Sequence, residues 1–184
     1  MGSIREEIRQ TRPFPSVADE GLVTLLRTAD ALRRALFAVV EPHGITLQQY
    51  NVLRILRGAG EEGLPTLDVA SRMIEASPGI TRLLERLERK RLVRRVRCPE
   101  DHRRVLCYVT DEARRLLTRL DRPMSRAGDR LLGPLGESRI RDLIRLLDDA
   151  RHTVPARASD DAREPDSVSK ARRKIRQKEH KEKS

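Results

Sequence analysis

Three side chains that could coordinate a metal or react as a redox centre, Cys98, His102 and Cys107, fall within ten residues of one another. A structural zinc site takes four ligands in a fixed pattern, so this set predicts no metal site. A redox pair is the better-supported chemistry, because the neighbouring Arg97 would favour the thiolate form of Cys98. We favour a plainer interpretation, in which Cys107 is a small apolar strand residue and Cys98 has no chemical role.

The stretch around these residues, RRVRCPEDHRRVLCYVT at 94–110, is rich in positive charge. Its first eleven positions hold five arginines, which are Arg94, Arg95, Arg97, Arg103 and Arg104. The acidic pair Glu100 and Asp101 lies in the middle of them. Guanidinium groups bind phosphate and carboxylate through paired hydrogen bonds, so the segment predicts a site for a negatively charged partner.

Catalytic motifs are not evident. The sequence has no nucleophile elbow, no glycine-rich phosphate loop and no H-E-x-x-H pair. His43, His152 and His180 stand alone, as surface or linker residues do. The leucine and isoleucine stripes indicate core or subunit interface, and no pattern suggests a cofactor. We therefore expect a protein that is not an enzyme and that needs no cofactor or metal.

Composition narrows the partner and the fold. The chain has 184 residues with a formal net charge of +11, 2% aromatic residues and no Trp. That length allows one domain with a sizeable core or two very small ones. Aliphatic residues must build the core, which favours packed helices over a β-sandwich. The charge favours a polyanion such as DNA, RNA or an anionic membrane surface.

The sequence also indicates a compartment. No apolar run approaches the roughly 20 residues that span a bilayer, and the first residues lack the apolar core of a signal peptide. Two cysteines without an export signal are typical of free thiols in a reducing compartment. We expect a cytoplasmic, nucleoid-associated protein with no membrane partner.

The elements in the first half of the chain follow from periodicity and capping residues. Residues 1–21 read as a polar N-terminal extension. A helix with one apolar face begins at Leu22 and stops at Pro42 and Gly44. Thr46, with Gln49 three residues later, predicts a capping box for a second helix. Thr66 then predicts the N-cap of a short third helix over 67–74.

The second half alternates helices with one predicted hairpin. Ser77 and Pro78 form an N-cap and N1 pair for a helix that runs to about Lys90. Two short strands, 92–97 and 104–109, join through a turn at residues 98–103.

Two further helices and a tail complete the chain. Thr110 caps a long fifth helix, which Pro123 should kink or break. A last helix covers 137–151. Residues 155–184 read as a disordered basic tail, in which 168–184 carry a net charge of +6.

This order of elements predicts a mainly α fold with a small β-hairpin (α+β), namely a winged helix-turn-helix. The fourth helix would pack its apolar stripe inward and place its N-terminal turn in a DNA major groove. Gly79 would let that turn approach a phosphate. From residue 77 to residue 110, ten Lys or Arg stand against four Asp or Glu, a net of +6. The candidate recognition-helix residues are Ser77, Pro78, Gly79, Thr81, Arg82 and Arg86.

The other basic residues near this helix carry less information. Arg89, Arg94, Arg95 and Arg97 are as consistent with solvated or phosphate-proximal side chains as with specific contacts.

The motifs PGITRLLERLERKRLVRR and CPEDHRRVLCYVTDEA resemble the recognition helix, wing and following helix of the MarR family of bacterial regulators. ITLQQYNVLRIL is similar to the family's second helix, and the resemblance covers about residues 22–152. It implies a homodimer built by N- and C-terminal dimerisation helices. It also implies that Arg103 enters the minor groove, held by Asp101, with His102 and Arg104 beside the DNA. A narrow minor groove attracts arginine, and an Asp two residues away can hold the guanidinium.

The sequence departs from the family at two positions. Arg91 stands where the family often has Gly, and a left-handed non-Gly residue costs on the order of 1 kcal/mol. Pro123 interrupts a helix that is commonly continuous.

Residues 22–154 are thus predicted to form a winged-helix DNA-binding and dimerisation domain. The expected function is that of a dimeric regulator that reads a pseudo-palindromic operator. The resemblance favours a repressor relieved by a small molecule or an oxidant, although no polar cluster marks an effector pocket. The alternative is a nonspecific, architectural nucleic-acid-binding protein driven by net charge.

Overall fold

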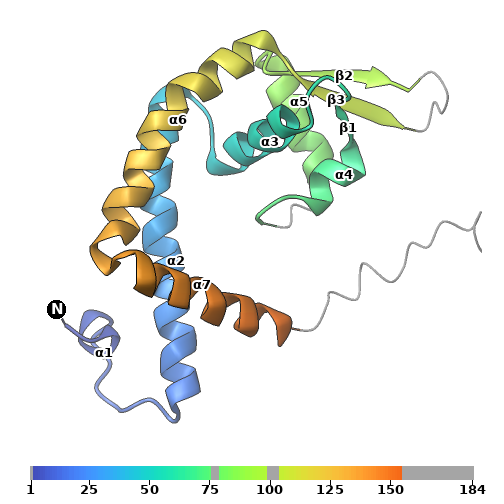
Figure 1. Ribbon diagram of the computed structural model, residues 1–184. Coiled ribbons are helices and arrows are strands. Elements are labelled where there is room, and N and C mark those ends of the chain that lie inside the picture. Colours follow the sequence, from blue (N-terminus) through green and yellow to red (C-terminus); the bar gives the residue numbers. More distant parts are fainter. Residues whose placement is uncertain (1, 76–78, 99–103, 155–184) are drawn as a thin grey trace, which may run out of the picture. The chain divides into compact units, whose positions relative to one another are not determined.

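The computed structural model of the chain is mainly helical, with one small antiparallel sheet (Figure 1). It describes residues 2–75, 79–98 and 104–154. The helices are α1 (Ile4–Glu7), α2 (Val17–Val40), α3 (Leu47–Gly58), α4 (Thr66–Ser71), α5 (Ile80–Arg89), α6 (Asp111–Leu132) and α7 (Glu137–His152), with 3-10 turns at Glu41–His43 and Gly133–Leu135. The strands are β1 (Leu64–Pro65), β2 (Val93–Arg97) and β3 (Val105–Val109). This confirms the predicted α+β winged-helix class.

Local capping explains where the first long helices begin and end. Ser16 accepts a hydrogen bond from the amide of Asp19, so α2 begins five residues before the predicted Leu22. Gly44 is left-handed with φ of 68° and ends the turn after α2. Thr46 and Gln49 form the predicted capping box at the start of α3.

The sheet has three strands in the order β1-β3-β2, so the predicted hairpin is confirmed but one strand was missed. Strand β1 has two residues, paired with Leu106 and Cys107. The prediction that Thr66 caps the next helix is wrong. Pro65 is the N-cap of α4, and the Thr66 hydroxyl faces β3 instead, 3.5 Å from the carbonyl oxygen of Val105.

Helix α4 is also shorter than expected. It ends at Ser71 rather than at residue 74, and the amide of Ile74 donates to the side-chain oxygen of Asn51 on α3 at 2.9 Å. The amide of Ile74 thus bonds to a side chain of a neighbouring helix, and not to a carbonyl group within a longer α4.

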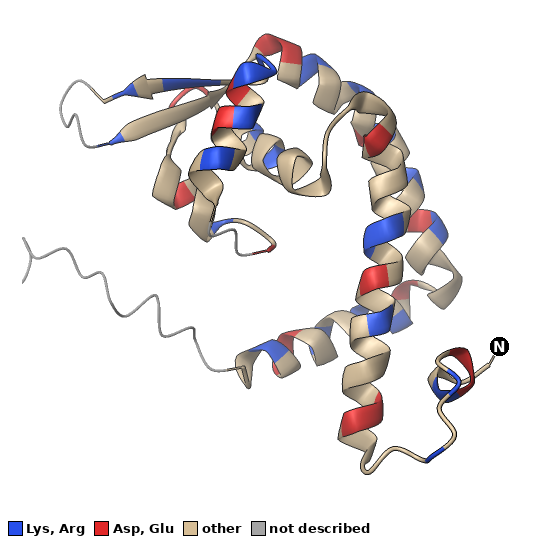
Figure 2. Cartoon of the chain, turned by 180° about the vertical axis from the view of Figure 1, so that it is seen from behind, with Lys and Arg blue, Asp and Glu red and all other residues tan. Residues whose placement is uncertain are grey.

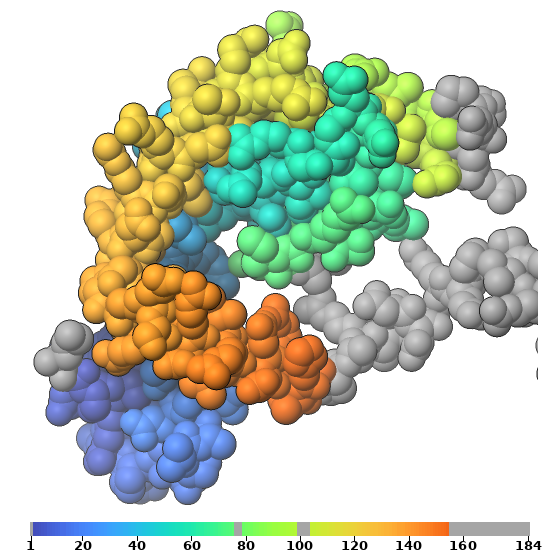
Figure 3. Space-filling view, in the orientation of Figure 1, coloured from blue at the N-terminus to red at the C-terminus, as the bar shows by residue number. Residues whose placement is uncertain are grey.

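Helix α6 runs without a break through Pro123, so of the two predicted outcomes, a kink or a break, the break does not occur. Figure 1 shows it as one curved helix. A proline removes one backbone hydrogen bond, but apolar residues on both sides of it are buried, including Leu120 and Ala127. Packing against α2 and α3 therefore maintains the helix on both sides of the proline, and Figure 3 shows the first half of α6 beside α3.

One hydrophobic cluster joins the helix-turn-helix, the sheet and α6. Its fully buried members include Leu53 and Leu56 of α3, Leu84 and Leu87 of α5, and Leu117 of α6. Burying each such leucine contributes roughly 1.5–3 kcal/mol, so this cluster is what fixes α5 and the wing on the body.

Helix α7 lies in a second compact unit that begins at Leu135 and is described here by itself. Gly136, with φ of 76°, precedes it, and its apolar side chains include Ile144 and Leu146, which are 52% and 67% exposed. Among the described residues, no helix is both long and apolar enough to cross a bilayer.

Candidate nucleic-acid interface

Helix α5 has one buried face and one free face. Ile80, Leu83, Leu84 and Leu87 are buried in the core. The opposite face is exposed, and it carries Thr81, Arg82, Glu85, Arg86 and Arg89. The spacing of apolar residues at i, i+3, i+4 and i+7 produces this division. The predicted residues Thr81, Arg82 and Arg86 are therefore all presented outward, and Figure 2 shows basic residues on α5 and along β2.

The start of this helix differs from the prediction. Gly79 is the N-cap of α5, without a side-chain capping bond, and the first helical residue is Ile80. Ser77 and Pro78, the predicted cap pair, lie outside the described residues. Among the described residues, a Cβ built on Gly79 would meet nothing within 4 Å, so none of them blocks an approach to this position.

One more backbone hydrogen bond joins the two wing strands just beyond their ends. The amide of Cys98 donates to the carbonyl oxygen of Arg104 at 2.9 Å, and Arg104 is exposed. Asp101, His102 and Arg103 lie outside the described residues. On β2, the guanidinium of Arg94 stacks over the Tyr108 ring at 4.5 Å from its centroid.

Arg95 departs from the expectation of a solvated or phosphate-proximal side chain. It is only 19% exposed and lies near Glu85 and Glu88 of α5.

The two cysteines differ in their surroundings. Cys107 is fully buried in the core and its thiol lies 3.7 Å from the Thr66 hydroxyl, whereas Cys98 is half-buried. Burial raises the pKa of Cys107, although the Thr66 contact and Arg95 act in the opposite direction. A raised pKa disfavours the reactive thiolate, so Cys107 is suited to packing. Within the described part of the chain, no group of three or more metal-ligating side chains occurs.

A lysine that the sequence did not single out ties the end of α5 to the α2–α3 turn. The Lys90 ammonium donates to the carbonyl oxygen of Gly44 and, at 3.3 Å, to the side-chain oxygen of Gln49. Gln49 is 4% exposed, and its side chain also completes the capping box of α3. Sequence reasoning had identified the box but not this second use of the glutamine.

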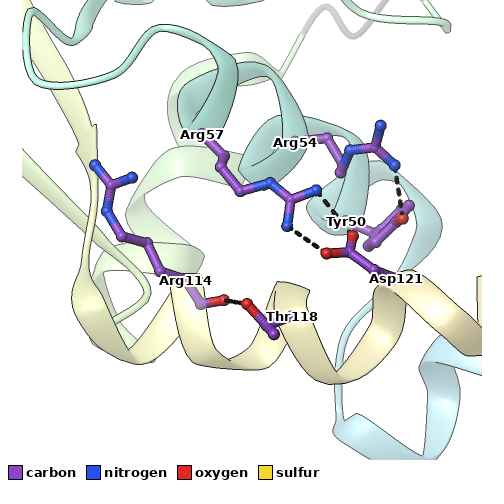
Figure 4. Close-up of polar contacts among 6 residues, drawn as sticks. All are labelled: Tyr50, Arg54, Arg57, Arg114, Thr118 and Asp121. Carbon is purple, nitrogen blue, oxygen red and sulfur yellow. Dashed lines mark hydrogen bonds and ion pairs between the residues drawn. The ribbon is translucent and has the colours of Figure 1, made fainter.

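A brace between α3 and α6 was also missed. Arg57 donates two hydrogen bonds to Asp121, at 2.8 and 2.9 Å, in the paired geometry that Figure 4 shows. Arg54 donates to the Tyr50 hydroxyl at 3.0 Å on the same face. The hydrogen bond from Arg57 lowers the pKa of Asp121. The separation of 64 residues between the partners left no signal in the sequence.

A cavity of about 490 Å³ lies between α2, α3 and the segment that precedes α5. Its walls are mostly apolar side chains, such as Leu32, Leu36, Leu47, Met73 and Met124. Arg33 and Arg54 provide the cationic groups of its lining.

Polar contacts join the lining of this cavity to the entrance of α5. Glu75 accepts from Arg33 of α2 at 2.9 Å and from Gln48 of α3 at 3.3 Å. The bond from Ile74 to Asn51 lies beside them. The cavity is thus connected to the chain only a few residues before the recognition helix.

Comparisons with known proteins agree with this geometry. Residues 35–120 match the family model described as transcriptional regulator SarA/Rot. The chain is 39% identical over 93 residues to the HTH-type transcriptional regulator TtmR of Methylorubrum extorquens (strain PA1), covering 50% of this chain and 47% of that protein. It therefore spans about half the length of that relative. It is 27% identical over 131 residues to the homoprotocatechuate degradative operon repressor of Escherichia coli, covering 71% of this chain and 87% of the repressor.

The family of this chain follows from its similarity to a solved structure. The crystal structure of a MarR transcription factor from Planctomyces limnophilus matches with a TM-score of 0.58 and 37% identity, over 74% of this chain and 98% of that one. These relatives are transcriptional regulators, which confirms the prediction that the chain is not an enzyme. The chain belongs to the MarR family of transcriptional regulators.

Proposed function

We propose that the protein is a dimeric, sequence-specific DNA-binding regulator that acts as a repressor. The observation that carries this proposal is the free arginine face of α5, whose opposite face is fixed in the core. A helix held in this way can enter a major groove about 12 Å wide. Arg82 and Arg86 would contact bases or phosphates there, and Thr81 would contact the backbone.

The wing would add a second contact. Arg103, positioned by Asp101, would enter the flanking minor groove, with His102 and Arg104 close to the phosphates. Ser77, Pro78 and Gly79 would bring the first turn of α5 to a phosphate. These roles rest on the sequence, on the family and on the open position of Gly79.

Exposed apolar side chains support a homodimer. On α2, Leu22 and Leu26 are 60% and 69% exposed and lie one helical turn apart. On α7, Ile144 and Leu147 are 52% and 38% exposed and also lie about one turn apart. Exposed apolar side chains that share one helix face are typical of an interface, and the resemblance assigns dimerisation to N- and C-terminal helices, among which are α2 and α7. A two-fold dimer would read a pseudo-palindrome whose half-sites lie about one helical turn apart.

The cavity beside α2 and α3 is the candidate effector site. Its apolar lining and its two arginines favour a small, largely apolar molecule with an acceptor or anionic group. A ligand that bound Arg33 would compete with Glu75 and would loosen the segment that leads into α5. Relief of repression would follow from that change. An oxidant acting at Cys107 is disfavoured by the burial of its thiol.

A competing function is nonspecific nucleic-acid binding, which the net charge of +11 and the basic tail favour. The experiment that separates the two is titration of genomic promoter fragments and of random DNA at several salt concentrations. A specific regulator should prefer its operator by ~10³-fold or more. Equal binding of promoter and random DNA at every salt concentration would establish the architectural alternative.

A further inference from the structure

The side chain of Arg95 joins the wing to the recognition helix. Arg95 is the central residue of β2, where it pairs with Cys107 of β3, and β2 is an edge strand. One of its terminal nitrogens lies 3.5 Å from a carboxylate oxygen of Glu88 and 3.8 Å from one of Glu85. Both glutamates belong to α5. The contact therefore spans from the middle of the wing to the helix that carries Arg82 and Arg86.

The backbone of Arg95 makes a second tie to the same helix. Its amide donates to the other carboxylate oxygen of Glu88 at 3.2 Å. An edge strand exposes unpaired amides on its outer side, and Glu88 satisfies one of them. Glu88 thus accepts a hydrogen bond from the amide of Arg95 and also attracts the Arg95 guanidinium. The two contacts together fix the distance between β2 and the last turns of α5.

Arg95 differs from its neighbours on β2. Arg94 and Arg97 are exposed, whereas the Arg95 side chain is 19% exposed. Its Nε is buried and has no hydrogen-bond partner among the residues that the structure describes. A guanidinium enclosed in this way is poorly placed to reach a phosphate. Its charge acts instead on Glu85 and Glu88, which stand beside the arginine face of α5 and would otherwise repel DNA.

We propose that Arg95 is a positioning residue, which sets the spacing between the recognition helix and the wing and thereby the spacing of operator segments that the protein accepts. The inference rests on the proposed function, because it requires that α5 and the wing bind neighbouring grooves. If the distance between α5 and the wing is fixed, both can bind at once only to DNA in which the two contacted segments have the matching spacing. Loss of the tie should weaken binding and should also make the protein tolerant of altered spacing.

The test compares Arg95→Gln with the control Arg97→Gln, an exposed arginine of the same strand. Each full-length protein is titrated with the operator recovered from its genome. It is also titrated with operators that carry one inserted base pair between the segments that footprinting assigns to α5 and to the wing. The wild-type protein should lose affinity on insertion, by about tenfold or more if one to two contacts are lost. Arg95→Gln should bind the native operator more weakly and lose at least threefold less than the wild type on insertion.

A triple variant separates positioning from charge. Adding Glu85→Gln and Glu88→Gln to Arg95→Gln removes the unpaired carboxylates, which should restore affinity for the native operator but not discrimination against the insertion. Recovery of both properties would show that Arg95 only neutralises charge. Retained discrimination in Arg95→Gln, equal to that of Arg97→Gln, would overturn the proposal.

Two controls keep the result interpretable. Thermal unfolding of each variant checks the fold, and Glu88→Ala provides a second route to breaking the tie if Arg95→Gln does not fold. If the wild-type protein shows no preference for its operator over random DNA, the proposed function itself fails. If it shows that preference and only the spacing result is negative, the inference about Arg95 fails alone.

Discussion

Arg33 and Glu75 form an ion pair with a nitrogen-to-oxygen distance of 2.9 Å between the long helix α2 and the segment that leads into α5. The two residues are 42 positions apart, and both line the cavity. A ligand that displaced Glu75 from Arg33 would therefore break a contact only a few residues before α5. The pair is one of the polar contacts that join the proposed effector site to the segment before the proposed DNA-binding helix, together with Gln48–Glu75 and Ile74–Asn51.

Breaking this pair should change DNA binding modestly and non-additively. Both side chains are about half-exposed, so the pair contributes roughly 0.2–1 kcal/mol. Arg33→Ala and Glu75→Ala should each weaken operator binding by less than about fivefold. The double variant should lose no more than either single one, because the residues act as a unit. Operator titrations of the four proteins measure this, and additive losses would count against the coupling.

The wing can be tested at Arg103. Arg103→Ala should weaken operator binding and reduce the salt dependence of the association constant by roughly one unit of slope. Asp101→Ala should lose part of the same free energy, non-additively with Arg103→Ala. Arg119→Ala, an exposed arginine of α6, is the control. Operator affinity that is indifferent to Arg103→Ala, with the dimer intact, would remove Arg103 from the interface.

Replacing Arg91 by glycine should raise the free energy of unfolding. Its φ of 59° places a non-glycine residue in the left-handed region, directly after α5. Arg91→Gly should relieve a strain of about 1–2 kcal/mol, part of which the greater freedom of an unfolded glycine offsets. We expect a net gain of about 0.5 kcal/mol in the free energy of unfolding, measured by urea denaturation. Arg91→Ala keeps the Cβ and should show no such gain.

The Arg57–Asp121 brace predicts a dependence on pH. The pKa of Asp121 is lowered in the folded state, so the pair stabilises the fold above the ordinary Asp pKa of about 3.9. That stabilisation is lost as the pH falls through the lowered value. Asp121 is 44% exposed, so Asp121→Asn should cost only about 0.5–1 kcal/mol at neutral pH and nothing in strong acid. Urea denaturation at several pH values tests this, with Asp129→Asn on the same helix for comparison.

The proposed dimer can be tested on the apolar face of α2. Leu26→Glu should introduce a charge into the proposed interface and convert the dimer to a monomer, as measured by analytical ultracentrifugation. Thr28→Glu, an exposed position on the other side of α2, should leave the dimer intact. A Leu26→Glu protein that stays dimeric would place the interface elsewhere.

The sequence alone determined the features that depend on neighbouring residues. The apolar period of α5, the capping box at Thr46 and Gln49, and the Thr110 cap of α6 all use contacts within four residues. The left-handed conformation of Arg91 was suggested by the resemblance, because the family often has Gly at this position, and not by the residues around it. These local rules were sufficient for the helix-turn-helix and the hairpin.

Only the tertiary structure decided which side chains meet across the fold. Arg95 on β2 was indistinguishable from the arginines around it until its strand was placed beside Glu85 and Glu88. Strand β1 has two residues, too few for a period of two to be visible, and its pairing with β3 turned Thr66 away from its predicted capping role. Pro123 stays within a continuous helix because packing on both sides of it outweighs the one backbone bond that it removes. In each case the deciding partner lies elsewhere in the fold, and its position follows from how the core packs as a whole rather than from the residues on either side.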